Sequence, residues 1–148
     1  MKMISFLLGV LIAITPEVPP TPPTAPILQN IRVLDGDTFY CDIDLGFDIV
    51  LKEQVVRIYN FDAWETSRRR QTVVVTDREI AMGKVAKLNL EQLLKGIVTV
   101  VESGHFDPYG RRSLWVFSNG KEVGAIMRAA GMERESIEPV GSKVKTKP

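Results

Sequence analysis

The feature that most constrains the fold is the run from Ile49 to Tyr59, which continues into a turn with charged side chains. The run is rich in β-branched residues and therefore predicts a long strand. Arg57 lies inside it, and Asp62 and Glu65 follow closely. Burying such groups costs several kcal/mol each unless they are paired or hold a cation. We therefore expect a charged site at the end of this strand.

The elements around this run follow a simple order along the chain. The sequence predicts strands over 30–34, 39–45 and 49–59, a helix over 77–95, strands over 97–102 and 113–117, and a helix over 123–130. The first helix is marked by a capping box, Thr76 with Glu79, and ends before Gly96. This order predicts an α+β, mainly β fold: a five-stranded barrel of the OB-fold type with two to three packed helices.

Composition fits one soluble domain, since 45% of the 148 residues are hydrophobic and 25% are charged. The net charge of +1 argues against a protein that holds nucleic acid by bulk charge alone. Cys41 is the single cysteine, so an intrachain disulfide is excluded, and its place in an alternating strand predicts a buried thiol. Trp115 and Phe117 fall at strand spacing, and we interpret them as core residues.

An apolar run and a proline-rich segment precede the expected barrel. Residues 4–14 are nearly all apolar, but a spanning helix needs about twenty such residues, so the run fits a secretory signal or an uncleaved membrane-associated segment. Six of the nine prolines fall within 16–26, which favours an extended linker. We expect an apolar segment over 1–15, a linker over 16–27, the folded domain over 28–135 and a disordered tail over 136–148. The protein is expected to be exported (secreted or periplasmic) or held at a membrane.

Three short motifs occur in a fixed order along the chain. They are Asp35-Gly36-Asp37-Thr38, then Arg57 followed by Asp62 and Glu65, then Asp107-Pro108-Tyr109-Gly110-Arg111. Each motif alone is common, because Asp-Gly pairs are ordinary turns. In this order, with strands and a helix between them, they resemble the staphylococcal nuclease (thermonuclease-like) family over residues 30–132. The OB-fold of that family agrees with the order of elements predicted above.

The resemblance implies an activity and a set of site residues. The activity is calcium-dependent hydrolysis of phosphodiester bonds in DNA, RNA or both, leaving 3′-phosphate and 5′-hydroxyl ends. The implied roles are calcium binding by Asp37, Asp62 and the backbone carbonyl of Ala63, general base catalysis by Glu65, phosphate stabilisation by Arg57 and Arg111, and substrate contact by Tyr109. We expect a monomer whose partners are the nucleic acid and, through residues 4–14, a membrane.

The side-chain types independently favour a hard cation. If Asp37, Asp62 and Glu65 converge, each pair of charges about 4 Å apart repels by about 4 kcal/mol at an effective dielectric near 20, and a divalent cation removes that cost. Oxygen ligands favour calcium or magnesium over zinc, and composition does not choose between the two. Two other interpretations stay open: a non-catalytic OB-type nucleic-acid-binding module, and a structural membrane-tethered protein. The sequence leaves open DNA against RNA, and endo- against exonucleolytic cleavage.

Overall fold

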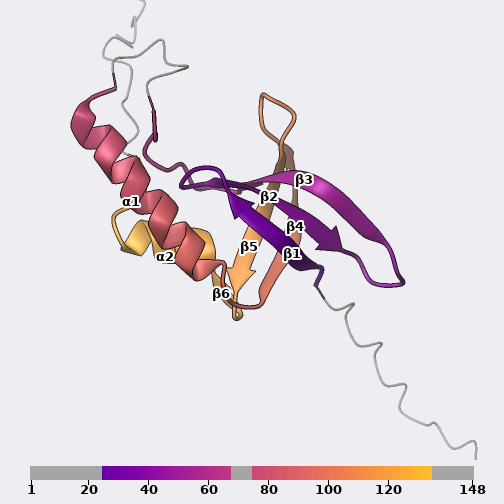
Figure 1. Ribbon diagram of the computed structural model, residues 1–148. Helices are drawn as coiled ribbons and strands as arrows, with labels where there is room; N and C mark the ends of the chain where they lie inside the picture. The colour runs from indigo at the N-terminus through magenta and orange to yellow at the C-terminus, as the bar shows by residue number, and fades with distance from the viewer. Residues whose placement is uncertain (1–24, 68–74, 135–148) are drawn as a thin grey trace, which may run out of the picture.

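The computed structural model of the protein describes residues 25–67 and 75–134. Within these ranges the chain forms a closed five-stranded barrel of mixed strand direction with two helices, an OB-fold-like α+β architecture (Figure 1). The predicted fold class is therefore confirmed. The predicted apolar segment over 1–15, nearly all of the linker over 16–27 and the tail over 136–148 lie outside the described residues.

The barrel closes through one parallel pairing. Its strands are β1 (Ile27–Val33), β2 (Thr38–Asp44), β3 (Val50–Ile58), β4 (Val98–Phe106) and β5 (Arg112–Ser118). β2 pairs with β1 and β3, and β4 pairs with β1 and β5, all antiparallel. The parallel pairing of β3 with β5 sets Arg57 opposite Ser113 and completes the circle. A two-residue strand, β6 (Lys121–Glu122), pairs with β5 after the turn at Asn119-Gly120.

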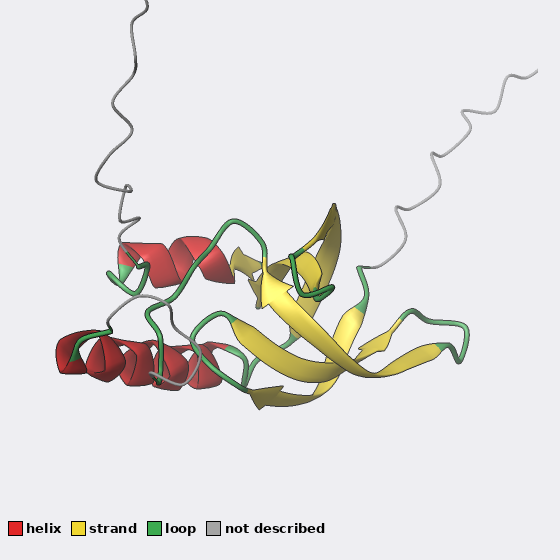
Figure 2. Cartoon of the chain, turned by 90° about the horizontal axis from the view of Figure 1, so that it is seen from above, coloured by secondary structure: helices red, strands yellow, loops and turns green. Residues whose placement is uncertain are grey.

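Two helices lie together at one end of the barrel, and the loop between β2 and β3 extends at the other (Figures 1 and 2). The helices are α1 (Asp77–Leu93) and α2 (Val123–Ala129). The predicted capping box is present: the Thr76 hydroxyl accepts from the Glu79 backbone N–H at 3.2 Å, and the Glu79 carboxylate accepts from the Thr76 N–H at 2.7 Å. No helix among the described residues is long and apolar enough to cross a membrane.

Alternating side chains of the strands fill the barrel. For β5, the prediction of which residues point into the core is wrong. Along β5, Leu114 and Val116 are buried in the core, whereas Trp115 and Phe117 are only half-buried. The period of two was correct, but both faces of β5 carry apolar side chains, so the sequence pattern alone could not choose the inward face. Cys41 is buried as predicted, and burial raises the pKa of its thiol to about 12.

Two strands, β1 and β4, extend at one end by three residues or more beyond the sequence prediction. β1 begins at Ile27 rather than at residue 30, because the pairing with β2 continues through a register shift near Asn30, whose φ is 51°. β4 continues to Phe106 rather than ending at residue 102. Gly104, with φ of 76°, lies in a second register shift that lets the β4–β5 pairing run on. Irregular pairing of this kind leaves little trace in hydrophobic periodicity.

Candidate functional site

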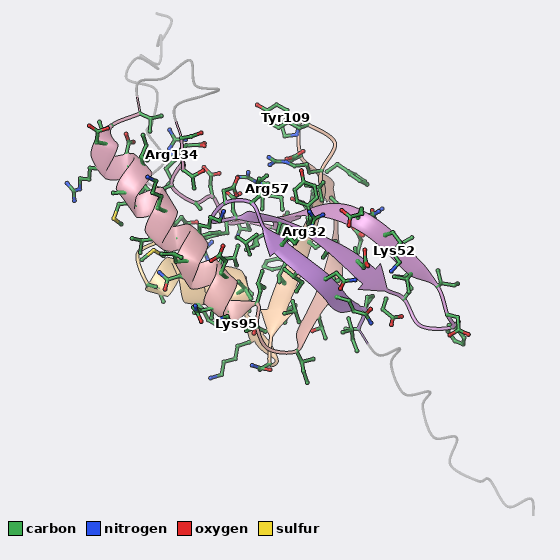
Figure 3. All side chains as sticks on the ribbon, viewed as in Figure 1. Arg32, Lys52, Arg57, Lys95, Tyr109 and Arg134 are labelled. Atoms are coloured by element: carbon green, nitrogen blue, oxygen red, sulfur yellow. The ribbon has the colours of Figure 1, made fainter. Side chains whose placement is uncertain are left out.

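A pocket of about 430 Å³ lies where the start of β2, the end of β3 and the β4–β5 loop meet. Figure 3 shows Arg57 in the middle of this region and Tyr109 on the projecting β4–β5 loop. Six of the seven residues predicted for the site line the pocket: Asp37, Arg57, Ala63, Glu65, Tyr109 and Arg111. The seventh, Asp62, contacts Arg57 directly. The barrel therefore brings together three segments that are far apart in sequence.

Asp37 is the buried acid of the pocket. Only 5% of the residue is exposed, and its carboxylate accepts from the Thr38 hydroxyl at 2.7 Å and from the Ala63 backbone N–H at 3.0 Å. The bond to Ala63 ties the start of β2 to the segment that follows β3. Both oxygens are therefore oriented by the fold before any ligand is considered.

Arg57 lies between the two predicted aspartates. Its Nη2 is 3.1 Å from Asp37 Oδ2 and also contacts Asp62 Oδ1. Burial raises the pKa of Asp37, opposed by the charge of Arg57, while the nearby Asp35 raises it further. Burial works against the charged form of Arg57 as well, yet Asp37 and Asp62 together raise its pKa. The guanidinium thus compensates two carboxylates that would otherwise repel each other.

Arg111 reaches the pocket from the β4–β5 loop and is held by Asp107. The Asp107 carboxylate accepts from Arg111 Nε and from the backbone N–H of Arg111 at 2.8 Å and of Tyr109 at 2.9 Å. Burial opposes the charged form of Asp107, but these bonds to Arg111 and Tyr109 lower its pKa. Arg111 Nη1 donates to the Thr38 hydroxyl at 3.2 Å. Thr38 therefore connects Arg111 to Asp37 through two hydrogen bonds.

Glu65 lines the pocket but stands apart from the two aspartates. Its side chain is 41% exposed, and Oε1 lies 3.6 Å from Nη1 of Arg134. The backbone beside Arg134 is itself anchored, because its N–H donates to the Asp62 carbonyl at 2.7 Å. The chain after α2 thus returns to this side of the barrel and places the Arg134 guanidinium next to Glu65. No sequence motif indicated this role for Arg134, since the contact spans most of the domain.

Two glycines allow α1 to approach the segment that carries Ala63 and Glu65. A Cβ on Gly36 would lie 2.6 Å from the Cβ of Ala63 and 2.8 Å from the Cβ of Ala86 in α1, and a Cβ on Gly83 of α1 would lie 2.1 Å from the carbonyl oxygen of Glu65. Atoms this close cannot coexist, so the helix packs directly on this backbone only because both positions lack a side chain. α1 therefore sets the position of Glu65 relative to the rest of the pocket.

Gly83→Ala is expected to destabilise the protein by about 1–3 kcal/mol, the usual cost of overpacking, and to displace Glu65. At an ordinary helix position the same change stabilises by up to about 1 kcal/mol. The free energy of unfolding, measured with urea, distinguishes the two cases. Lys84→Ala, at the neighbouring exposed position, is the control and should unfold like the wild type. A Gly83→Ala protein more stable than the wild type would contradict the close contact.

The side chains around Arg57 include two carboxylates, whose oxygens are the ligand type that a hard divalent cation prefers. The carboxylates of Asp37 and Asp62 both contact Nη2 of Arg57, so they lie within reach of a common ion. Within residues 25–67 and 75–134, no three His, Cys, Asp or Glu side chains are grouped closely enough to hold a metal. The expected convergence of Glu65 with the two aspartates is therefore not seen. A cation at this place would take its remaining ligands from backbone carbonyl oxygen and water.

Sequence reasoning missed three residues that organise the pocket: Thr38, Asp107 and Arg134. Two of them had a local signal, because Thr38 follows Asp37 directly and Asp107 precedes Arg111 by four residues in a turn. His105 lies near the end of β4, where its ring stacks on Tyr59 with 5.2 Å between the ring centroids. It does not line the pocket.

Comparison of the chain with protein-family models and with curated protein sequences gives no match. The nuclease resemblance therefore remains a hypothesis that rests on the motifs and on the geometry of the pocket.

Proposed function

We propose that the protein is a calcium-dependent nuclease that hydrolyses phosphodiester bonds of DNA, RNA or both, as the motifs of the staphylococcal nuclease family imply. The same proposal includes export of the protein or its association with a membrane through residues 4–14. The competing interpretation is a non-catalytic module of the OB type that binds nucleic acid. The charges of the pocket support the enzyme over the binding module.

The observation that carries the proposal is the presence of two arginines and two aspartates in one site. Arg57 and Arg111 suit a phosphate, since each presents a planar fork of donors. Asp37 and Asp62, paired with Arg57, would repel the same phosphate. A module that only binds nucleic acid gains nothing from these two acids. An enzyme needs them, because they hold a divalent cation that polarises the phosphate when bound.

With the arginines assigned to the phosphate and the aspartates to the cation, roles follow for the remaining site residues. The Ala63 carbonyl would complete the protein ligands of calcium beside Asp37 and Asp62. Glu65 takes a proton from water as the water oxygen bonds to phosphorus and the bond from phosphorus to the 5′ oxygen breaks. The 5′ oxygen leaves as an alkoxide and takes a proton from solvent water to become a hydroxyl, and the phosphate stays on the 3′ side. The exposed Tyr109, whose ring lies 5.4 Å from the Arg111 guanidinium carbon, contacts the nucleotide.

Cleavage of single-stranded DNA is expected to require calcium and to stop in excess chelator. Asp62→Asn should lower the rate at least a hundredfold and raise the calcium concentration needed for half-maximal rate, because a neutral amide is a poorer ligand for a hard cation. The measurement is the initial rate of cleavage over a calcium titration, repeated with magnesium.

Asp48→Asn provides the matched control. Asp48 lies in the β2–β3 loop at the other end of the barrel, and asparagine tolerates its φ of 61°. This variant should have the calcium dependence of the wild type. Undiminished cleavage in chelator would exclude the cation, whereas tight binding of DNA without cleavage under every condition would favour the binding module.

A further inference from the structure

The β2–β3 loop exposes three apolar side chains, Leu45, Phe47 and Ile49, which we call the apolar loop. Their exposed fractions are 44%, 97% and 53%. The loop is an ordered turn, because Leu45 N–H donates to the Ile49 carbonyl at 2.9 Å and Ile49 N–H donates to the Gly46 carbonyl at 2.9 Å. An apolar cluster held out on an ordered loop is typical of a surface that contacts a partner.

The N-terminal segment joins the barrel beside the apolar loop. Ile27, the first residue of β1, pairs with Asp44, the last residue of β2, and is itself 41% exposed. A groove of about 390 Å³ connects the two places, and its walls include Ala25, Pro26, Leu45 and Leu51. The chain upstream of residue 25, which contains the apolar run over 4–14, therefore joins the barrel next to the loop.

We propose that the apolar loop docks on a lipid bilayer, with Phe47 and its neighbours in the interfacial region. The apolar run over 4–14 has eleven residues and is short for a spanning helix, which needs about twenty. Membrane attachment strengthens with the apolar area that is buried, so a second apolar contact adds to that of one short apolar run. The apolar loop supplies the second. This proposal does not depend on the nuclease assignment.

The pocket and the apolar loop lie at opposite ends of the β2–β3 hairpin. Thr38 pairs with Arg57 at the pocket end of the β2–β3 hairpin, and Asp44 pairs with Val50 at the loop end. The seven residues of β2 span about 20 Å at roughly 3.3 Å per residue. Figure 1 shows the hairpin loop at one side of the molecule, and Figure 3 shows Tyr109 on a different loop. A bilayer under the apolar loop leaves the pocket open to water.

A bilayer fits the apolar loop better than a second copy of the chain does. A stable protein interface buries about 800 Å² on each partner, which is more than three loop side chains supply. Insertion into the interfacial region needs only a few apolar side chains that reach about 5–10 Å deep. Asp44 and Asp48 flank the apolar residues, so a zwitterionic surface suits the loop better than an anionic one.

The first test places a polarity-sensitive fluorophore on the full chain through Phe47→Cys. Cys41 is buried, so the label reacts with the introduced thiol. Phosphatidylcholine vesicles should shift the emission of the label to the blue. The control carries the label through Leu88→Cys on α1, a position that is 58% exposed, and its emission should stay unchanged. Equal responses at both positions, or none at position 47, would overturn the proposal.

The second test measures vesicle affinity by co-sedimentation of the full chain. Phe47→Asn should weaken binding about tenfold or more, since one large side chain no longer leaves water. Asparagine accepts the φ of 53° at this position, so the turn is kept. Leu88→Gln is the control and should bind like the wild type. Unchanged binding by Phe47→Asn would overturn the proposal. In the first test, a blue shift of the label at position 47 that appears without vesicles and grows with protein concentration would also overturn it, because it would indicate that a second copy of the chain covers the loop.

Discussion

Arg111→Lys is expected to slow cleavage about a hundred- to a thousandfold while affinity for single-stranded DNA stays nearly unchanged. Losing one donor to the charge that develops in the transition state costs about 3–4 kcal/mol. Lysine keeps the positive charge, so the electrostatic part of binding remains. Its single ammonium group cannot bond to Asp107, Thr38 and a phosphoryl oxygen in the fixed geometry of a guanidinium.

Folding should survive this change, because Asp107 keeps the backbone N–H groups of Tyr109 and Arg111 as donors. Arg112→Lys is the matched control, since the Arg112 guanidinium pairs with Glu102 on the surface and lies outside the pocket. Arg57→Lys should behave like Arg111→Lys. Turnover and DNA affinity are measured for each variant. Wild-type turnover in both Arg57→Lys and Arg111→Lys would remove the catalytic assignment and favour the binding module.

The parts of the site that could be predicted from sequence are those with local causes. The capping box at Thr76 needs only four consecutive residues. Asp37 follows a tight turn, and Arg57 lies between the buried Val56 and Ile58 near the end of a strand that its β-branched residues predict. The closed barrel then brings Arg57 and Arg111 to one pocket, because the parallel pairing of β3 with β5 fixes their separation.

The parts that could not be predicted depend on long-range packing. Glu65 pairs with Arg134, and that contact exists only after the chain beyond α2 has returned to the pocket. Arg57 neutralises the charges of Asp37 and Asp62 only because the folded chain brings the start of β2 and the segment after β3 to its side chain. The close approach of Gly83 to the Glu65 carbonyl is invisible in a sequence, where the residue only weakens a helix.

Asp37→Asn should abolish the response to calcium without lowering the stability of the metal-free protein. Burial, only partly offset by Arg57, raises the pKa of Asp37 above its ordinary value of 3.8. The stabilising contribution of the protonated carboxyl is therefore fully present below pH 3.8 and is lost as the pH rises through the raised folded value. At neutral pH the charged carboxylate is unfavourable, and a neutral amide of the same shape avoids that cost. The NH2 group of the amide then faces one of the donors from which a carboxylate oxygen accepts, and this loss offsets the gain, so the stability stays close to that of the wild type. Arg57 retains Asp62 as a partner.

Calcium is expected to reverse this balance in the wild type, because a bound ion would stabilise the charged carboxylate that burial penalises. At about 100 times its dissociation constant, an ion that binds only the folded state adds about 2.7 kcal/mol, or roughly 10–20 °C in Tm for a small domain. Thermal unfolding with and without calcium should show this rise in the wild type and none in Asp37→Asn, whose cleavage rate falls about a thousandfold or more. A calcium-dependent rise in the variant would exclude Asp37 as a ligand. A large loss of stability without calcium would mean that the pair with Arg57 outweighs burial.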